Sequence, residues 1–297
     1  MRIGYFADGP WGQLALKKIL ADDSLRVIFI TLRYNNPDKR IVKIAKEHSI
    51  PIEQSKNINS AEYLNRISKY NAEIFVSMSF DQIFKAETYN IPVFKTINCH
   101  AGKLPYYRGR NILNWALIND EKEFGITVHY VDEGIDTGDI ILQDIYPITD
   151  EDDYGTLLNR AYDGCADILY RAIKKIQDNS VTRVKQKDIS PVGMYCGKRD
   201  VGDEILNWNQ TSREVFNFVR AISKPGPQAR SWIDGNEIQI NKVRLIEGAP
   251  IYKNNPGQIL QKTKSGFLVK TKDTFVEVIE YTFDGKIKAG SRLINHA

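Results

Sequence analysis

Short apolar runs alternate with amphipathic stretches in the first half of the chain. The runs at residues 2–6, 26–31 and 73–80 show no clean alternation of polar and apolar positions, which is typical of parallel strands covered on both faces. The stretches at 12–21 and 39–49 place apolar residues three and four positions apart, as an amphipathic helix does. This order of elements predicts an α/β fold in which right-handed crossovers connect parallel strands.

The pattern changes in the second half of the chain. An apolar stripe with helical spacing predicts one long helix over 152–178, whereas the polar, glycine-containing residues 181–203 indicate a linker. Another helix is expected at 211–221, followed by short segments rich in Val, Ile and Thr that are separated by the turn sequences DGN, KNNPG, KSG and DGK. We therefore expect a first domain at 1–180 and a small β-barrel or sandwich domain at 204–297.

Composition excludes several classes of protein. Of the 297 residues, 42% are apolar and 26% are charged, which is ordinary for a globular protein, and no run of eighteen apolar residues predicts a membrane span. The N-terminus enters a strand pattern at once, so we expect no signal peptide and a cytoplasmic location. The net charge of +4 is only a weak indication of an anionic partner and does not require nucleic acid.

The cysteines indicate neither a disulfide framework nor a metal site. Cys99, Cys165 and Cys196 form an odd, sparse set without CxxC spacing. We expect reduced thiols and no bound metal.

The loop after the first strand is the first candidate ligand site. Its sequence, ADGPWGQ, does not match GxGxxG, and no acidic residue ends the second strand, so a nicotinamide cofactor is not expected. The loop nevertheless follows the carboxyl end of a parallel strand, where open α/β folds bind ligands. Asp8 and Trp11 are therefore candidate substrate contacts, with the Trp11 ring either stacking on a ligand or packing as a partly buried surface aromatic.

Two later segments contain polar residues of chemical interest. In NCHAGKLPYYRGRNILNWAL, residues 98–117, His100 is one of only four histidines and lies between a strand-like run and a loop with glycine and proline. In EFGITVHYVDEGIDTGDIILQ, residues 123–143, a glycine-containing turn presents Asp136. Taken alone, an asparagine or aspartate in such a turn is more often a side-chain cap than a catalytic group.

Together, these motifs resemble the folate-dependent formyltransferase family. The resemblance rests on Asn98, His100 and Asp136 and on the flanking LPYYRG and GIDTGDI, and it extends to the C-terminal ILNW, VRAISKPGPQARSW and AGSRL. It implies a Rossmann-like formyltransferase domain with a mostly parallel sheet, followed by a small, OB-like C-terminal β-barrel. It also implies N10-formyltetrahydrofolate as the co-substrate and a homodimer as the assembly.

The three matched residues suit acyl transfer to an amine. The attacking amine must be neutral, and His100 can take its proton because imidazole titrates near neutral pH. Asp136 would orient the imidazole ring and stabilise its positive charge after proton transfer. The Asn98 carboxamide would donate a hydrogen bond to the developing oxyanion.

The folate contacts are implied by the resemblance alone. In relatives, the pterin lies in a pocket made largely of backbone groups that follow the fourth strand and surround the DTGD turn. The corresponding residues of this sequence are Ser79, Phe80, Asp81, Gln82, Ile83, Gly134, Ile135 and Thr137.

Within the family, the loops favour a nucleotide-linked amino sugar as the acceptor. HAGKLPYYRGR differs from the HASLLPRWRG typical of methionyl-tRNA formyltransferases, and the segment after the second strand lacks the basic insertion with which those enzymes bind tRNA. A sugar nucleotide has a diphosphate, for which Lys103, Arg108 and Arg110 are candidate donors, with Tyr107 beside them. Arg108 could instead tether its own loop.

The sequence therefore predicts formyl transfer to the amine of a dTDP- or UDP-linked 4-amino-4,6-dideoxy sugar, for surface polysaccharide such as the O-antigen of lipopolysaccharide. Expected partners are the folate and this sugar nucleotide, without nucleic acid or a membrane. Methionyl-tRNA formylation is the first alternative, and a non-catalytic folate-binding or nucleotide-sugar-binding protein is an alternative of another class. The sugar, the position of its amine, the nucleotide base and the role of the C-terminal domain stay open.

Overall fold

A computed structural model describes residues 1–295, which divide into two compact units. Unit 1 consists of Met1–Gly109, Phe124–Tyr146 and Asn159–Cys196, and unit 2 consists of Arg110–Glu123, Pro147–Leu158 and the described chain from Gly197 onward. The domain boundaries predicted at residues 180 and 203 stay predictions. Each unit is a set of segments that lie close together, and such a set need not be a domain that folds on its own.

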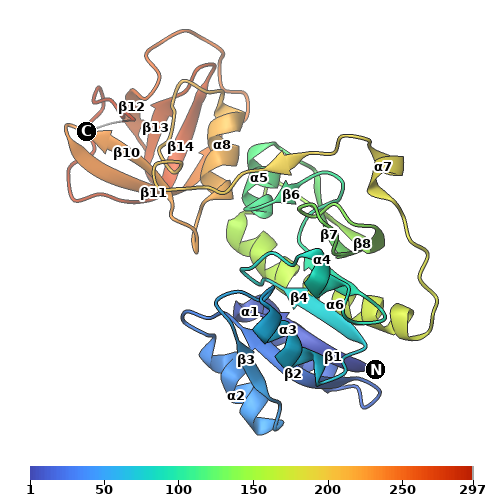
Figure 1. Ribbon diagram of the computed structural model, residues 1–297. Helices are drawn as coiled ribbons and strands as arrows, with labels where there is room; N and C mark the ends of the chain where they lie inside the picture. The colour runs from blue at the N-terminus through green and yellow to red at the C-terminus, as the bar shows by residue number, and fades with distance from the viewer. Residues whose placement is uncertain (296–297) are drawn as a thin grey trace. The chain divides into compact units, whose positions relative to one another are not determined.

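The first unit is built on a seven-stranded sheet with the strand order β3-β2-β1-β4-β5-β7-β8 (Figure 1). The first five strands pair in parallel, and β7 joins β5 in the antiparallel direction. The predicted mostly parallel α/β fold is thus confirmed. The strands are β1 (Arg2–Ala7), β2 (Arg26–Leu32), β3 (Ile52–Gln54), β4 (Ile74–Met78), β5 (Thr96–His100), β7 (Glu123–Tyr130) and β8 (Ile140–Pro147).

Helices cover both faces of this sheet, which explains why its strands lack alternation. On β1, the hydroxyl of Tyr5 donates to the Gly12 carbonyl of α1 on one face (2.9 Å), whereas Phe6 packs with Tyr63 of α3 on the other. The helices up to residue 177, other than α5 of unit 2, are α1 (Gly9–Leu20), α2 (Lys39–Glu47), α3 (Ala61–Ser68), α4 (Ala86–Tyr89) and α6 (Tyr154–Gln177). The predicted long helix at 152–178 is α6, and α1 begins earlier than predicted because Pro10 suits the first turn of a helix.

Four phenylalanine rings form the centre of the core beside α3. Phe6 meets the rings of Phe29, Phe75 and Phe84 edge to face, with centroids 5.8, 5.2 and 4.9 Å away. Each such pair stabilises the fold by about 0.5–1.5 kcal/mol beyond its buried area. Gly4 makes room for the cluster, because a Cβ there would lie 2.4 Å from the Phe29 ring.

Three short elements complete unit 1. Residues 181–196, in the stretch predicted to be a linker, contain α7 (Gln186–Ile189) and β9 (Tyr195–Cys196). Strand β9 pairs in parallel with β6 (Arg108–Gly109), so this stretch lies beside the loop that follows His100.

The second unit contains the expected C-terminal β domain. Its antiparallel sheet has the order β10-β11-β14-β13-β12, with α8 packed against β11 and α5 packed against α8. Thr211 and Glu214 form a capping box at the start of α8, which confirms the helix predicted at 211–221. The elements are α5 (Ile112–Ile118), α8 (Ser212–Ala221), β10 (Ala229–Ile233), β11 (Asn236–Leu245), β12 (Ile259–Lys262), β13 (Phe267–Lys270) and β14 (Phe275–Thr282).

The helices of residues 1–295 are short or polar relative to a membrane span. None of them combines the length and the apolar character that crossing a bilayer requires.

Candidate active site

The pairing of β5 with β7 brings three polar side chains together. Asn98 and His100 are two positions apart on β5 and therefore point to the same face of the sheet. In the antiparallel register, His129 lies opposite Asn98 and Thr127 lies opposite His100. Cross-strand neighbours share a face, so His129 joins the two residues that the sequence predicted.

The turn after β7 brings Asp136 to this cluster. The Asp132 carboxylate accepts hydrogen bonds from the Gly134 backbone N–H (3.2 Å) and the Thr137 hydroxyl (2.5 Å), which closes the turn around Asp136. A Cβ at Gly134 would lie 2.1 Å from the Thr137 hydroxyl oxygen, so only glycine fits. Asp136 itself has a φ of 55°, a conformation that aspartate tolerates better than most residues.

His100 is held by two acceptors. Its Nε2 lies 2.7 Å from the carbonyl oxygen of Tyr107, and its Nδ1 lies 3.5 Å from Asp136 Oδ2. A carbonyl only accepts, so Nε2 bears a hydrogen, and a neutral ring then has its lone pair on Nδ1. A proton taken up at Nδ1 would lie between the ring and the Asp136 carboxylate.

His129 orients the Asn98 amide. The Nδ1–H of His129 donates to the Tyr130 carbonyl (2.8 Å), which leaves Nε2 to accept from Asn98 Nδ2 at 3.3 Å. The Asn98 amino group is therefore turned toward His129, and its second hydrogen is available to another acceptor. His129 Nε2 also lies 3.5 Å from Asp136 Oδ1.

Asp136 is held as a carboxylate. Burial alone would raise its pKa, but the imidazoles of His100 and His129, which attract the carboxylate when they are protonated, and the backbone N–H of Gly109 (2.9 Å) hold that pKa well below the usual range. A lowered pKa in the folded state stabilises the protein above the ordinary aspartate pKa, and this stabilisation is lost as the pH falls below it. The cluster therefore combines a fixed negative charge, a histidine that can exchange a proton and an amide donor.

The first group of predicted folate contacts follows β4. Because β4 and β5 are parallel neighbours with Met78 opposite Cys99, Ser79 and His100 emerge at the same edge of the sheet. Phe80 packs on the phenylalanine cluster, and Gln82 is bonded to two backbone groups of residues 55–58. Ile83 is exposed.

The second group surrounds Asp136 in the turn. Gly134 and Thr137 close that turn, and Ile135 is exposed. Asp81, of the first group, lies 3.8 Å from the Arg33 guanidinium. As folate contacts, both groups stay predictions.

The predicted contacts in the first loop already have protein partners. Arg33 Nε lies 3.2 Å from the Asp8 carboxylate. Burial raises the pKa of Asp8 despite this cation, and two neighbouring carboxylates add to the rise. The Trp11 ring meets Tyr162 edge to face, with centroids 4.5 Å apart.

The three predicted diphosphate donors and the neighbouring Tyr107 lie in different environments. Arg108 is buried, and all three guanidinium nitrogens bond to groups of residues 186–195. Tyr107 is buried, and its backbone carbonyl is the acceptor beside His100 Nε2. The Lys103 side chain packs on Gly125. Arg110 is exposed and is the first residue of a segment that belongs to unit 2. As acceptor contacts, these residues stay predictions.

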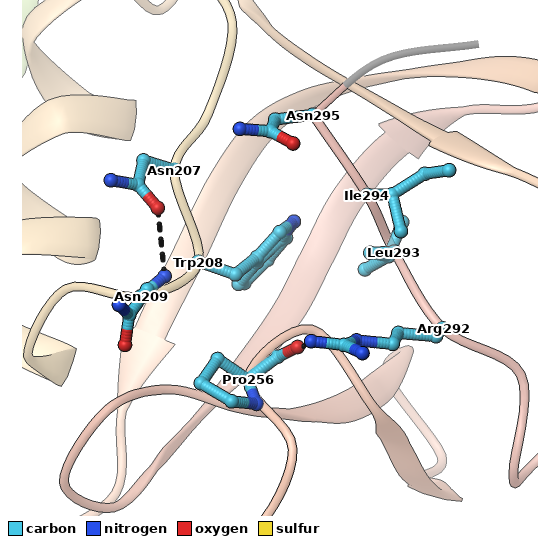
Figure 2. A pocket seen from close by; sticks show the side chains of 8 residues that line it. All are labelled: Asn207, Trp208, Asn209, Pro256, Arg292, Leu293, Ile294 and Asn295. Atoms are coloured by element: carbon cyan, nitrogen blue, oxygen red, sulfur yellow. Dashed lines mark hydrogen bonds between the residues drawn. The ribbon is translucent and has the colours of Figure 1, made fainter.

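Two hollows in unit 2 are lined by other residues. Figure 2 shows one of about 330 Å³, where the indole of Trp208 lies between Asn209 and Leu293, and the Arg292 guanidinium donates to the Pro256 carbonyl (2.9 Å). The other, of about 490 Å³, is lined mainly by residues 198–204 and 222–227. Neither lining includes Asn98, His100 or Asp136, so the side-chain cluster defines the candidate active site. Within residues 1–295, no group of three or more His, Cys, Asp or Glu side chains could hold a metal ion.

Two features of the site were not recognised from the sequence. In the sequence, His129 is one residue of the strand-like run ITVHYV. The signal that could have identified it is its position two residues after Thr127, which places both polar side chains on the same face of a strand. Gly102 lies against His100 and Tyr107 in the loop that follows β5, because a Cβ there would lie 2.5 Å from both His100 Nε2 and the Tyr107 carbonyl oxygen.

Comparison with known proteins covers nearly the whole chain. A family model described as formyl transferase matches residues 24–173, and one described as formyl transferase, C-terminal domain, matches residues 199–296. A methionyl-tRNA formyltransferase of Syntrophomonas wolfei is 32% identical over 96% of this chain and 92% of that protein. One from Caldanaerobacter subterraneus subsp. tengcongensis is 28% identical over 100% of this chain and 97% of that protein.

Solved structures share the fold. The sugar 3N-formyl transferase WlaRD, crystallised with dTDP and 5-N-formyl-THF, superposes with a TM-score of 0.71 over 97% of this chain and 99% of its own, at 23% identity. At that identity the likeness concerns the fold alone.

The predicted acceptor, a nucleotide-linked amino sugar, is wrong. Five relatives with 28 to 32% identity over most of the chain are all named methionyl-tRNA formyltransferases. The sugar transferase above is less similar in sequence, so the loop differences that favoured a sugar do not decide the acceptor.

Proposed function

Since the chain belongs to the formyl transferase family, we propose that it transfers the formyl group of N10-formyltetrahydrofolate to the amino group of methionyl-tRNA. Formyl transfer from the folate is the activity of the family, and the acceptor is the part that we propose. The observation that supports this acceptor is the name shared by relatives that are 28 to 32% identical over most of the chain.

The two predicted folate segments fit a pterin. Phe80 and Gln82 are held by protein contacts, which leaves the backbone of the first segment for hydrogen bonds to the pterin ring. Ile83 and Ile135 are 67% and 52% exposed, and a flat ring system would cover such apolar side chains. When bound, the folate supplies an activated formyl carbon.

The cluster supports a proton path for the reaction. Nδ1 of His100 accepts a proton from the amine as its nitrogen bonds to the formyl carbon, and Asp136 stabilises the resulting imidazolium. The second amide hydrogen of Asn98 donates to the oxyanion, since the first is engaged by His129. His100 then returns the proton to the departing folate nitrogen, so that the residue is regenerated.

The charge distribution supports a polyanionic acceptor. Residues 201–297 contain fourteen Lys and Arg against ten Asp and Glu, whereas the two kinds balance in residues 1–200, so the net charge of +4 belongs to the C-terminal part. Polyphosphate ligands are attracted by such an excess.

Helix α2 supports the same acceptor. The segment after β2 lacks a basic insertion, but α2 presents four exposed cations: Lys39, Arg40, Lys43 and Lys46. Lys39, Lys43 and Lys46 are spaced four and three residues apart and therefore share one face of the helix. A helix face of this kind offers phosphate contacts without an insertion.

The proposal is tested by supplying acceptors in parallel. Purified protein with labelled N10-formyltetrahydrofolate should formylate methionyl-tRNA at many turnovers per enzyme, and methionine or uncharged tRNA should remain unlabelled. The same assay includes dTDP- and UDP-linked amino sugars. Efficient labelling of a sugar with none of methionyl-tRNA would reject the acceptor but leave the transfer chemistry intact.

Loss of cations from α2 should weaken tRNA binding in a salt-dependent way. For the double variant Lys39→Ala, Lys46→Ala, the slope of log affinity against log salt should become shallower by about 1 to 2, because each lost phosphate contact removes roughly 0.7–0.9. Filter binding at several salt concentrations measures it. The control double variant, Lys69→Ala, Lys175→Ala, also removes two exposed cations. Lys69 lies at the end of α3, and Lys175 lies on α6. Equal slopes for both double variants would show that α2 has no direct contact.

A further inference from the structure

A buried glutamine from the 186–196 segment binds the turn that contains Asp136. Gln186, the first residue of α7, is 2% exposed. Its Nε2 donates to the backbone carbonyls of Asp136 (2.7 Å) and Gly138 (2.8 Å). Its Oε1 accepts from Nε (3.0 Å) and Nη2 (2.7 Å) of Arg108. Two donors and two acceptor positions are all that a glutamine amide has, so Gln186 is fully bonded in one orientation.

Arg108 connects this glutamine to the loop that follows His100. Its Nη1 donates to the Tyr195 hydroxyl (3.2 Å) and the Val192 carbonyl (3.4 Å), and its guanidinium stacks on the Tyr195 ring at 5.2 Å. Gly109, the next residue, donates its backbone N–H to the Asp136 carboxylate. Arg108 thus joins two segments that both bind Asp136.

Both ends of Asp136 are therefore fixed. The side chain accepts from Gly109, and the backbone carbonyl accepts from Gln186. The turn also packs closely on β7 at Gly138, because a Cβ there would lie 1.8 Å from the Tyr130 carbonyl oxygen. With φ in the left-handed region, the Asp136 peptide needs outside support to keep its direction.

We propose that Gln186 is a positioning residue for formyl transfer: it holds the Asp136 carboxylate at the distance from His100 that stabilises the proton taken from the amine. The proposal rests on the proposed function of the cluster. Without the Nε2 donors, the buried carbonyl of Gly138 and the partly buried carbonyl of Asp136 lose their partner, and the turn must shift to find another. Displacement of a reacting group by about 1 Å can cost about 10²-fold in rate.

The variant Gln186→Glu separates positioning from anchoring. A glutamate keeps the acceptor for Arg108, and strengthens it to an ion pair, but removes the donors to the carbonyls of Asp136 and Gly138. We expect kcat for methionyl-tRNA to fall about 10- to 100-fold, with a much smaller change in KM for methionyl-tRNA, because Gln186 acts on the turn that contains Asp136. Gln186→Asn withdraws the neutral amide by one methylene and gives the same test if the glutamate variant does not fold. The control Gln54→Glu removes a donor to the Arg33 carbonyl and should leave kcat unchanged.

A double-variant cycle with Asp136→Asn distinguishes this role from a purely structural one. If Gln186 acts through Asp136, adding Gln186→Glu to Asp136→Asn should lower kcat by less than about twofold further. An undiminished kcat in Gln186→Glu, or the same fold-loss in both backgrounds, would overturn the proposal. A wild-type kcat in Asp136→Asn alone would instead remove Asp136 from the mechanism and with it the proposed chemistry.

Discussion

Replacement of His100 by alanine is expected to lower kcat by roughly 10² to 10⁴-fold, the usual contribution of a positioned acid–base group. The amine must lose a proton as it becomes an amide, and Nδ1 of His100 is the atom that can take it beside Asp136. Steady-state kinetics with methionyl-tRNA and N10-formyltetrahydrofolate measure the loss. KM values should change far less than kcat.

The control for this variant is His48→Ala. His48 is exposed at the end of α2 and has no place in the cluster, so kcat should not change. Thermal melting establishes that the His100→Ala variant is folded at the assay temperature, so that a lower kcat reports the lost imidazole and not unfolding. A parental kcat in a folded His100→Ala protein would exclude the proton path through Nδ1.

Replacement of Asn98 by alanine is expected to lower kcat by roughly 10² to 10³-fold, as removal of one oxyanion donor does in other acyl transfers. Asn98→Asp is the sharper variant, since it preserves shape and exchanges the donor for an acceptor. It should be at least as slow as the alanine variant, because it places a negative charge beside the oxyanion.

Comparison of the two Asn98 variants separates the effect of side-chain shape on kcat from the effect of the amide N–H donor. If Asn98→Asp were as active as the parent, the amide hydrogen would have no role in the reaction. A loss below about tenfold for Asn98→Ala would likewise argue that the oxyanion is stabilised elsewhere.

The fold was predictable because the local pattern of apolar and polar residues indicates which faces of a helix or strand are buried. Runs such as residues 26–31 are apolar on both faces, and the structure places helices on both faces of their sheet. Helix α8 was recognisable because Thr211 and Glu214 form a capping box at the start of its amphipathic pattern. The direction of β7 was not predictable in this way, since antiparallel pairing with β5 depends on contacts between distant segments.

The same distinction applies to the site. Asn98, His100 and Asp136 were singled out through their motifs, but each also has a partner from another segment: His129 for Asn98, Asp136 for His100, and Gly109 and Gln186 for Asp136. Gln186 is 50 residues from Asp136 in sequence and lies in a stretch whose polar composition predicted only a linker. No local pattern encodes such a bond.

The acceptor was mispredicted for a physical reason. Absence of a basic insertion after β2 does not exclude a tRNA-binding surface. Charge acts through its position in space, and α2 places Lys39, Lys43 and Lys46 on one helical face within a short segment.

The discontinuous chain of unit 2 has a consequence for biosynthesis. Helix α5 buries Ile112, Leu113 and Leu117, and it packs against α8, whose Ala221 carbonyl accepts from Asn114 (2.6 Å). At a synthesis rate of about 5–20 residues per second, α8 leaves the ribosome roughly 5–20 s after α5. Through that interval the apolar face of α5 lacks its native partner on the nascent chain. Unit 2 therefore completes its folding only after α8 and the strands that follow it have been synthesised.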